Sequence, residues 1–264
     1  MNDNHTYPIL DIIKSNIQYL MSHNIENAKL EVELILCEVL KCDKIDLYIK
    51  PQIINKSDYK IISDYINQRI DGEPIQYILG NSYFYGQKFL VNPHVLIPRF
   101  DSELIIELLT KHEYSNDLLD VGTGSGNLAI TIITENLAKN VIATDISNHQ
   151  IDVAQYNKIQ ICPHSNIDFV IDNFLNSELD QKFDTIISNP PYIPKSEMNK
   201  LDDVVKNYEP SNALTDGGNG YIFYKQFAKL GPKLLKEDGV MFLEIGINNQ
   251  IAHLKKIFKN YHIK

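Results

Sequence analysis

Ten consecutive residues decide the fold of this chain: Leu118-Leu119-Asp120-Val121-Gly122-Thr123-Gly124-Ser125-Gly126-Asn127. An apolar run leads into a turn with three glycines, and a helical pattern follows. Glycine lets the backbone turn sharply and lets a ligand come close, and the helix after the turn presents unpaired N–H groups. The stretch therefore predicts a strand, a tight turn and a helix, with a ligand site at the turn.

Further strands are predicted on both sides of this stretch. Short apolar runs, most of them separated by helical stretches, occur at residues 118–122, 141–146, 168–171, 183–188 and 240–245. Strands that alternate with helices are typical of a parallel sheet covered on both faces. We therefore expect an α/β, Rossmann-like domain with its ligand at the carboxyl ends of the strands.

The type of nucleoside is indicated by two features near the turn. Asp145 ends the second strand, where a carboxylate can accept the hydroxyl protons of a ribose. The glycines follow G-x-G-x-G, and Asn127 stands where the dinucleotide fingerprint G-x-G-x-x-G has its third glycine. This pattern favours S-adenosylmethionine over NAD, and Asp120 is expected to organise the amino end of that ligand. Asp172-Asn173-Phe174, after the third strand, is expected at the adenine, with the contacting residue left open.

A second motif, Asn189-Pro190-Pro191-Tyr192, follows the fourth strand. Two successive prolines fix φ and remove two backbone donors, which leaves a rigid turn that offers carbonyl oxygens. Asn189 Oδ1 and the Pro190 carbonyl can accept the two hydrogens of a planar –NH2 group, and Tyr192 can stack on its plane. Holding such a nitrogen in line with a sulfonium methyl group favours methyl transfer, and no dedicated general base is required.

The first 80 residues differ from the rest of the chain. Apolar residues recur three or four apart, as in Ile9, Ile13, Ile17 and Leu20, and no glycine occurs before Gly72. This predicts a small all-α bundle over residues 1–80, with Ser57 as the N-cap of a helix. Aromatic and β-branched residues at 81–98, around Gly86, predict a β-hairpin that joins the bundle to the α/β domain over residues 99–264.

Together these motifs resemble the HemK-type amino-methyltransferases, and three more segments carry the resemblance. They are Glu73-Pro74-Ile75-Gln76-Tyr77-Ile78-Leu79-Gly80, Leu96-Ile97-Pro98-Arg99-Phe100-Asp101-Ser102-Glu103, and Tyr208-Glu209-Pro210 with Ala213-Leu214 and Asp216-Gly217-Gly218. The resemblance covers nearly the whole chain. It implies a class I S-adenosylmethionine-dependent methyltransferase that methylates N5 of the glutamine in the Gly-Gly-Gln loop of peptide chain release factors, with S-adenosylhomocysteine as product.

Site residues follow from the resemblance position by position. Gly122–Gly126, Asp145 and Asp172–Phe174 would hold the cofactor, together with Asp120 and Asn189. Asn189, Pro190 and Tyr192 would be catalytic and, with Pro191, would hold the substrate amide. Arg99, Asp101, Ser102 and Glu103 would line or brace the site, with Arg99 and Glu103 binding substrate. No metal is implied.

The chain departs from the family pattern at a few positions. Phe100 replaces the usual proline, and Ser102 replaces threonine but keeps the hydroxyl. Methyltransferases of this fold end in two further strands, whereas here Tyr261–Lys264 would only begin the sixth strand, so the C-terminal strands look incomplete and one sheet edge would stay unpaired. The long segment 195–220 is expected to be a mobile loop that closes on the protein substrate.

Composition narrows the alternatives. The net charge is −9 and only two of the 25 cationic residues are arginine, which argues against an adenine-N6 methyltransferase of DNA or RNA, although that class shares the Asn189–Tyr192 motif. A glutamine methyltransferase of a ribosomal protein and a non-catalytic nucleoside-binding module remain as alternatives. Three cysteines, Cys37, Cys42 and Cys162, with no CxxC pair favour a reducing cytosol. The N-terminus does not read as a secretory signal and no apolar run reaches roughly 18 residues, so no membrane partner is expected.

Overall fold

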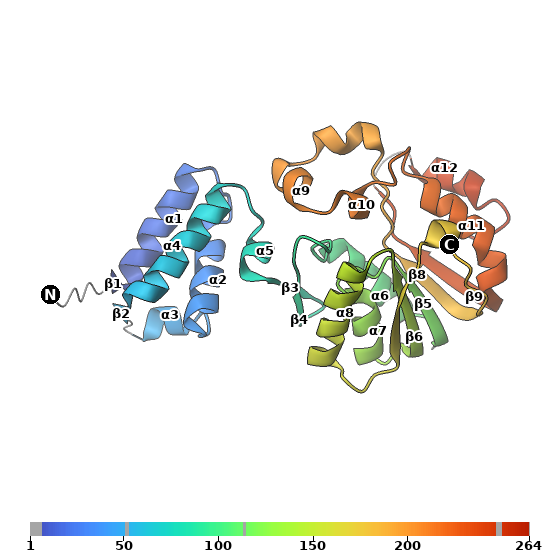
Figure 1. The fold of residues 1–264 in the computed structure, drawn as a ribbon, viewed down its shortest axis with the longest axis horizontal. Coiled ribbons are helices and arrows are strands. Elements are labelled where there is room, and N and C mark those ends of the chain that lie inside the picture. Colours follow the sequence, from blue (N-terminus) through green and yellow to red (C-terminus); the bar gives the residue numbers. More distant parts are fainter. Residues whose placement is uncertain (1–6, 51–52, 113–114, 247–249, 264) are drawn as a thin grey trace. The chain divides into compact units, whose positions relative to one another are not determined.

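A computed structural model describes residues 7–50, 53–112, 115–246 and 250–263 (Figure 1). The chain divides into two compact units, residues 1–80 and 81–264. None of the helices in the described part is long and apolar enough to cross a membrane. Each unit has its own hydrophobic core and is described by itself.

Unit 1 is helical. Its elements are β1 (Tyr7–Pro8), α1 (Ile9–Ser22), α2 (Ala28–Leu40), α3 (Asp46–Ile49), β2 (Ile53–Ile54), α4 (Lys56–Ile70) and α5 (Ile75–Leu79). Residues one helical turn apart, such as Ile9, Ile12 and Ile13, point into a shared core with Val32, Ile35 and Leu36. The predicted cap is corrected: Asn55 accepts the Asp58 N–H at 2.9 Å and caps α4, whereas Ser57 lies inside the first turn.

Unit 2 begins with the predicted hairpin. Strands β3 (Asn81–Phe84) and β4 (Gln87–Leu90) pair antiparallel, and the turn between them contains Tyr85 and Gly86, both at positive φ. Phe84 and Phe89 are buried in the core of unit 2, so the hairpin packs with the α/β part of the chain.

The remaining elements of unit 2 alternate strand and helix. They are η1 (Phe100–Ser102), α6 (Glu103–Leu109), β5 (Ser115–Val121), α7 (Asn127–Thr134), β6 (Ala138–Asp145), α8 (Asn148–Ile161), β7 (Ile167–Ile171), η2 (Phe174–Asn176), β8 (Phe183–Ser188), η3 (Lys195–Lys200), α9 (Asp203–Tyr208), α10 (Ser211–Leu214), α11 (Ile222–Leu234), β9 (Leu235–Leu243) and α12 (Gln250–Ile257).

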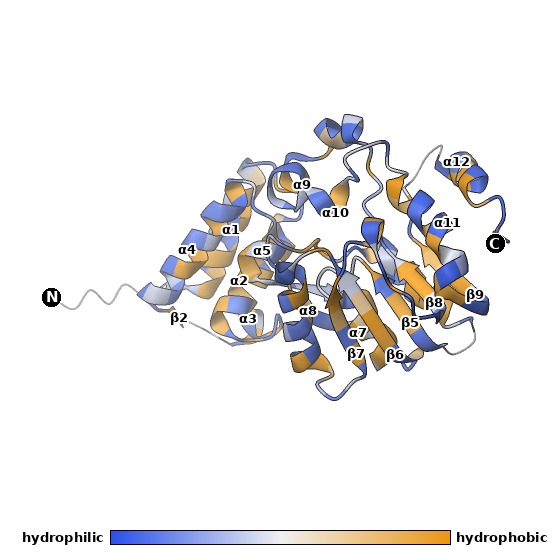
Figure 2. Ribbon diagram, turned by 45° about the vertical axis from the view of Figure 1, so that its right-hand side comes forward, coloured by the Kyte–Doolittle hydropathy of each residue, from blue (hydrophilic) through white to orange (hydrophobic). Residues whose placement is uncertain are grey.

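The five later strands form one parallel sheet in the order β7-β6-β5-β8-β9. Leu118 of β5 is buried on one face with the hairpin, α6 and α7, while Leu119 is buried on the other with α11 and α12. Figure 2 shows the strands of this sheet as predominantly hydrophobic, as expected for a sheet buried on both faces. The predicted α/β fold with a parallel sheet and a preceding helical unit is therefore confirmed.

The strand order places the functional edge of the sheet. The chain leaves β5 toward β6 and β7 on one side, and then returns to add β8 and β9 on the other. The carboxyl ends of β5 and β8 therefore lie side by side where the strand order reverses, which is where parallel α/β sheets bind ligands. The glycine turn follows β5 and Asn189 follows β8, so topology alone brings the two motifs together.

The C-terminal prediction needs correction. Tyr261–Lys264 was expected to begin a sixth strand, but Tyr261, His262 and Ile263 are not in a strand, and Lys264 lies outside the described residues. The Tyr261 hydroxyl instead donates to the Ala228 carbonyl at 3.0 Å, which fastens the segment after α12 to α11.

Candidate active site

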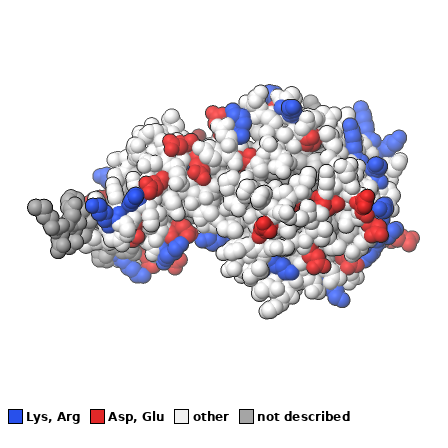
Figure 3. All heavy atoms as spheres, viewed as in Figure 1, with Lys and Arg blue, Asp and Glu red and all other residues white. Residues whose placement is uncertain are grey.

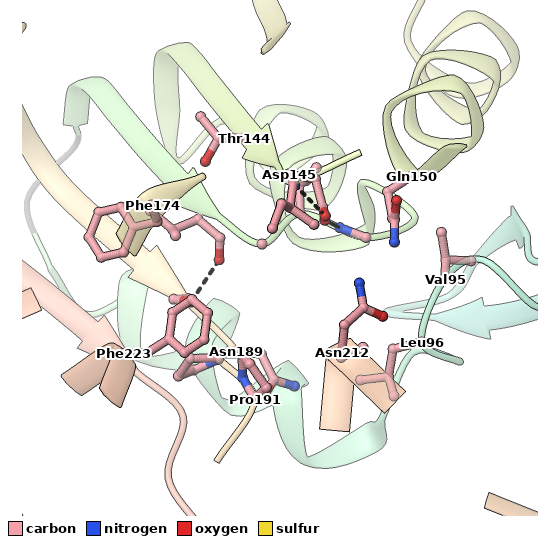
Figure 4. Close-up of a pocket in the computed structure, with 18 of the residues that line it drawn as sticks. Val95, Leu96, Thr144, Asp145, Gln150, Phe174, Asn189, Pro191, Asn212 and Phe223 are labelled. Carbon is pink, nitrogen blue, oxygen red and sulfur yellow. Dashed lines mark hydrogen bonds between the residues drawn. The ribbon is translucent and has the colours of Figure 1, made fainter. Parts of the chain in front are cut away.

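A cavity opens at the carboxyl ends of β5, β6 and β8 in unit 2. Its lining includes most of the predicted site residues: Arg99, Gly122, Thr123, Gly124, Ser125, Asp145, Asp172, Asn173, Phe174, Asn189, Pro190 and Pro191. In Figure 4, Asp145 and Gln150 lie on one side of this cavity and Asn189 and Pro191 on the other. One cavity thus joins the two motifs that the sequence analysis singled out.

The turn after β5 is held by its neighbours. The Gly122 and Thr123 N–H groups donate to the Thr144 carbonyl of β6, both at 2.9 Å, and the Ser188 hydroxyl of β8 donates to the Val121 carbonyl at 2.7 Å. Gly124 stands at a φ of +56°, and the space where a side chain would begin is open. A ligand can therefore approach this backbone closely.

Gly126 has a different role from the one predicted. It does not line the cavity, and a Cβ atom at this position would lie 3.1 Å from Ala154 Cβ and 3.1 Å from Ile130 Cδ1. It also has a φ of +79°, at the N-cap of α7. Gly126 therefore lets the turn pack closely against α8 and supports the site from outside the cavity lining.

Asp145 is prepared to accept hydroxyl groups. Its Oδ2 accepts the Gly124 N–H and its Oδ1 accepts the Ile146 N–H, each at 2.8 Å. Burial raises the pKa of the carboxyl group, and the two backbone hydrogen bonds counteract this rise. The remaining lone pairs are available to a ligand hydroxyl pair.

Asp120, in β5 two residues before Gly122, is fully buried and does not itself line the cavity. Burial raises its pKa to about 7; the Thr123 hydroxyl and the Ala129 N–H are near enough to oppose this rise, and Asp145 adds to it. Neither carboxylate oxygen has a partner with hydrogen-bond geometry among the described residues, and Asp172 Oδ2 is likewise buried without one. Buried acceptors without partners are costly, so these groups fit a ligand that carries cationic and N–H groups.

The three residues after β7, which were expected at the adenine, differ in the groups that they leave free. Phe174 lines the cavity but is 4% exposed, and its ring packs on Phe227 with centroids 4.4 Å apart. Asn173 Oδ1 accepts the Leu175 N–H at 3.2 Å. Asp172 Oδ2 is the unsatisfied acceptor in this segment. Asp172 is therefore the residue of this segment with an acceptor left for a ligand, while Phe174 contributes an apolar wall.

Asn189 is oriented by two neighbours from distant parts of the chain. Its Nδ2 donates to Ser102 Oγ at 2.9 Å, and Ser102 Oγ donates to Glu244 Oε2 at 2.5 Å. Ser102 ends η1, and Glu244 directly follows β9. Because Nδ2 is turned toward Ser102, Oδ1 is the atom of the carboxamide left to accept a hydrogen bond from a ligand.

Tyr192 and Glu103 are placed differently from the prediction. Tyr192 does not line the cavity; its hydroxyl donates to Glu244 Oε1 at 3.2 Å and its ring packs in the core beside α11. Glu103 accepts the Tyr85 N–H at 2.7 Å and thereby fastens the hairpin turn to α6. Neither side chain lines the cavity, so this geometry gives no support to a stack of Tyr192 on the substrate amide or to a substrate contact of Glu103.

The segment 195–220 contains ordered elements, η3, α9 and α10, and it closes one side of the cavity. Arg99 donates to Glu209 Oε1 at 2.6 Å, so the arginine fastens this segment to residues 97–99. Asn212 and Asp216 line the cavity, and in Figure 4 the Asn212 side chain points into it. Asn212 and Asp216 were not among the predicted site residues, and neither were Gln150, Phe223 and Glu244.

Comparison with known proteins identifies the family. Residues 11–80 match the PrmC N-terminal domain, and residues 99–261 match the methyltransferase small domain. A release factor glutamine methyltransferase from Fusobacterium nucleatum is 39% identical over 258 residues, which cover 95% of this chain and 72% of that protein. The chain belongs to the release factor glutamine methyltransferase family.

Other members of the family support the same assignment. The Bacillus cereus protein of that name is 36% identical, over 81% of this chain and 78% of its own length. The Bacillus subtilis protein is 38% identical, over 75% of this chain and 71% of its own length. The resemblance inferred from the motifs is thus confirmed at the level of the family, and the matches cover both units of the chain.

Proposed function

We propose that this protein transfers a methyl group from S-adenosylmethionine to the side-chain amide nitrogen, N5, of the glutamine in the Gly-Gly-Gln loop of a peptide chain release factor. Asn189 carries the proposal. It lines the same cavity as Asp145, and its donor nitrogen is engaged by Ser102, which leaves its oxygen to accept from a primary amide. Membership in the release factor glutamine methyltransferase family supports the choice of substrate.

The cavity residues fit S-adenosylmethionine, which supplies an electrophilic methyl group on a sulfonium centre when it is bound. Asp145 would accept from the ribose hydroxyls and Asp172 from the adenine amine. Asp120 precedes the turn as a buried carboxylate without a cation; because it does not line the cavity, it would attract the ammonium group of the amino-acid end across the turn or through a water. Gly124 would leave room for that end to approach the backbone.

The chain's own residues would activate the substrate by orienting it. Asn189 Oδ1 and the Pro190 carbonyl would accept both hydrogens of the glutamine amide and hold its nitrogen toward the methyl group. An amide nitrogen shares its lone pair with the adjacent carbonyl, so fixing its geometry and stabilising the charge that develops on N–H lowers the barrier. Pro191 has no N–H that would compete for these acceptors.

Substrate docking is assigned to the helical unit. It exposes apolar side chains of α2 and α3 and of the residue before α3, namely Leu30, Ile45, Tyr48 and Ile49. Leu30, Ile45 and Tyr48 line an open hollow together with Glu33 and Lys44. A mixed apolar and charged hollow suits a protein partner better than a nucleic acid.

The charge distribution supports a protein substrate as well. In Figure 3, charged residues of both signs are scattered over a mostly uncharged visible surface, and a group of basic residues lies near α11 and α12. The basic residues of α12 include Lys255 and Lys256. We therefore propose a cytoplasmic protein-modifying enzyme and expect no direct nucleic acid substrate.

The test is a transfer assay with S-adenosylmethionine that carries a labelled methyl group. We expect label in a release factor and none in a variant whose loop glutamine is replaced by alanine. A large-subunit ribosomal protein and DNA serve as competing substrates. Equal labelling of the two release factors, or labelling of DNA alone, would refute the proposal.

A further inference from the structure

A chain of hydrogen bonds runs from Glu244 through Ser102 to Asn189. The three residues come from the ends of β9 and η1 and from the turn after β8, so the chain joins elements far apart in the sequence. Ser102 is 2% exposed and its hydroxyl is shared between the other two side chains. Glu244 lies outside the Asn189–Tyr192 motif and does not line the cavity.

The direction of these hydrogen bonds follows from proton counting. A serine hydroxyl has a single proton, and Ser102 donates it to Glu244 Oε2 at 2.5 Å. Ser102 must then accept from Asn189, whose Nδ2 lies 2.9 Å away. Glu244, the acceptor at the far end of this series of hydrogen bonds, therefore determines which end of the Asn189 carboxamide faces Ser102.

The orientation matters because the two ends of a carboxamide have nearly the same shape and opposite hydrogen-bonding character. With Nδ2 on Ser102, Asn189 presents an oxygen to the substrate and can accept an amide N–H. With the side chain flipped, Asn189 would present N–H to N–H and would repel the amide of the substrate. The network therefore selects the productive orientation before the substrate arrives.

Glu244 is itself firmly held. Its Oε1 accepts the Tyr192 hydroxyl at 3.2 Å, and its backbone carbonyl accepts the Tyr224 hydroxyl at 2.7 Å. Burial, helped by the nearby Glu244, raises the pKa of Tyr192 to about 12, so this hydroxyl stays protonated and stays a donor. Tyr192 thus contributes to the site through Glu244, which explains its place outside the cavity.

We propose that Glu244 and Ser102 are positioning residues that fix the Asn189 carboxamide with its oxygen toward the substrate amide. The inference rests on the proposed function for its catalytic consequence, while the orientation itself can be observed without any substrate. Ser102 lines the cavity beside Asn189 and Glu244 does not; in this proposal Asn189 contacts the substrate amide and the other two act by orienting it.

Kinetic tests use matched variants. Ser102→Ala removes the hydroxyl that accepts from Asn189, and Glu244→Leu removes the carboxylate that orients this hydroxyl. In both variants we expect kcat to fall between about tenfold and a hundredfold, with KM for the release factor and affinity for S-adenosylmethionine within about threefold of the wild type. Ser102→Thr keeps the hydroxyl and Glu244→Gln keeps an accepting oxygen, so both should retain kcat within about fivefold. Thermal melting shows whether each variant is folded.

Ser115→Ala is the matched control. Ser115 is also 2% exposed, and its hydroxyl is hydrogen-bonded to Thr185 Oγ1 at 2.7 Å. It lies at the amino end of β5, away from the cavity at the carboxyl end. We expect this variant to lose a similar amount of stability and to keep the kcat of the wild type. If Ser115→Ala lowers kcat as much as Ser102→Ala does, the effect is one of general stability and the inference is overturned.

A measurement without substrate separates this inference from the proposed function. The side-chain amide signals of Asn189, identified by their loss in Asn189→Asp, should exchange slowly with solvent in the wild type and at least about tenfold faster in Ser102→Ala and Glu244→Leu. Unchanged exchange and unchanged kcat in these variants would overturn the inference. If the wild type fails to methylate the release factor but the exchange pattern holds, the proposed function fails and the positioning network stands.

Discussion

The two ends of the central sheet use carboxylates in opposite ways. At the amino ends of the strands, Lys236 Nζ lies 2.7 Å from Asp117 Oδ2 and 3.1 Å from Asp184 Oδ2. The hydrogen bond from Lys236 holds the pKa of Asp117 below its usual range; burial opposes the same effect at Asp184, but hydrogen bonds from the Asp117 N–H and Lys236 prevail. At the carboxyl ends, burial raises the pKa values of Asp120, Asp145 and Glu244.

A single strand, β5, carries both kinds of carboxylate: one paired with a lysine of the chain and one buried without a cation. Asp117 and Asp120 lie three residues apart on β5, yet only Asp117 has a cation of the chain as its partner. Among the ion pairs of the described residues, none involves Asp120, Asp145 or Glu244. Carboxylates that are buried without a counter-charge destabilise the fold, which fits the ligand roles proposed for Asp120 and Asp145 and the positioning role proposed for Glu244.

The largest effect is expected from Asn189→Ala at the carboxyl end. It removes an acceptor that is engaged only when the substrate amide is bound, so kcat should fall about a hundredfold to a thousandfold. Affinity for S-adenosylmethionine, measured by calorimetry, should stay within about threefold. The same substitution at the other end, Asn140→Ala, removes the 3.0 Å hydrogen bond to Asp117 and should leave methyl transfer unchanged. Equal losses in both variants would erase the proposed difference between the two ends.

Asp145→Asn should weaken cofactor binding by about tenfold to a hundredfold, because it removes a charged acceptor for the ribose hydroxyls. Asp117→Asn, at the amino end of the neighbouring strand β5, is the control and should leave the cofactor affinity as in the wild type. Equilibrium binding of S-adenosylhomocysteine measures both. If Asp145→Asn binds S-adenosylhomocysteine as tightly as the wild type does, Asp145 does not bind the ribose.

The pH dependence of binding sharpens the comparison further. Asp120, with a pKa of about 7, is mostly protonated at pH 6 and mostly ionised at pH 8. A ligand ammonium group favours the ionised form, so the affinity for S-adenosylhomocysteine should rise by up to about tenfold over this range. In Asp120→Asn the dependence should disappear. If the affinity of Asp120→Asn still depends on pH, a group other than Asp120 causes the pH dependence.

The same substitution should also change stability. A carboxyl group with a raised pKa in the folded state binds more protons than in the unfolded state, so the stability of the wild type falls as pH rises from about 4 toward 7. Asp120→Asn lacks this loss and should melt at a higher temperature than the wild type at pH 8. Near pH 4 the two proteins should melt at similar temperatures, and a lower melting temperature for the variant at pH 8 would contradict the account.

The smallest effect is expected from Lys236→Met at the amino end. The lysine side chain is 35% exposed, so solvent screens its two ion pairs and their loss should cost about 1 kcal/mol of unfolding free energy. The pKa values of Asp117 and Asp184 are lowered in the folded state, so the stabilisation is present above pH 4 and is lost as pH falls through their folded values. Chemical denaturation should show a larger difference between variant and wild type at pH 7 than at pH 3, with methyl transfer intact.

Sequence reasoning located the backbone of the site better than its side chains. The glycine turn, Asp145 and Asn189 were predicted because each follows an apolar strand, and the ends of parallel strands meet at one edge. The same rule applied to Val240–Ile245 would have found Glu244, which lies in a run of apolar residues at that edge. The end of an apolar run indicates where a strand ends, and the functional residues lie at or just after that point.

The directions of side chains could not be read from spacing. Tyr192 turns to Glu244 and Phe174 to Phe227 because tertiary packing decides their rotamers. Glu103 was assigned to the substrate from its motif, but the Tyr85 N–H of the hairpin is its partner. Asn212 and Asp216 enter the cavity through a long segment whose path follows from contacts such as Arg99 with Glu209, and no local pattern encodes that path.

The most direct test of the central claim is a crystal structure of the protein with S-adenosylhomocysteine and a peptide that contains Gly-Gly-Gln. The account predicts the nucleoside hydroxyls on Asp145, and the glutamine side-chain nitrogen within hydrogen-bond distance of both Asn189 Oδ1 and the Pro190 carbonyl, facing the sulfur. An Asn189 side chain turned away from the nucleoside, or a cavity with no room for the glutamine amide beside it, would contradict the account.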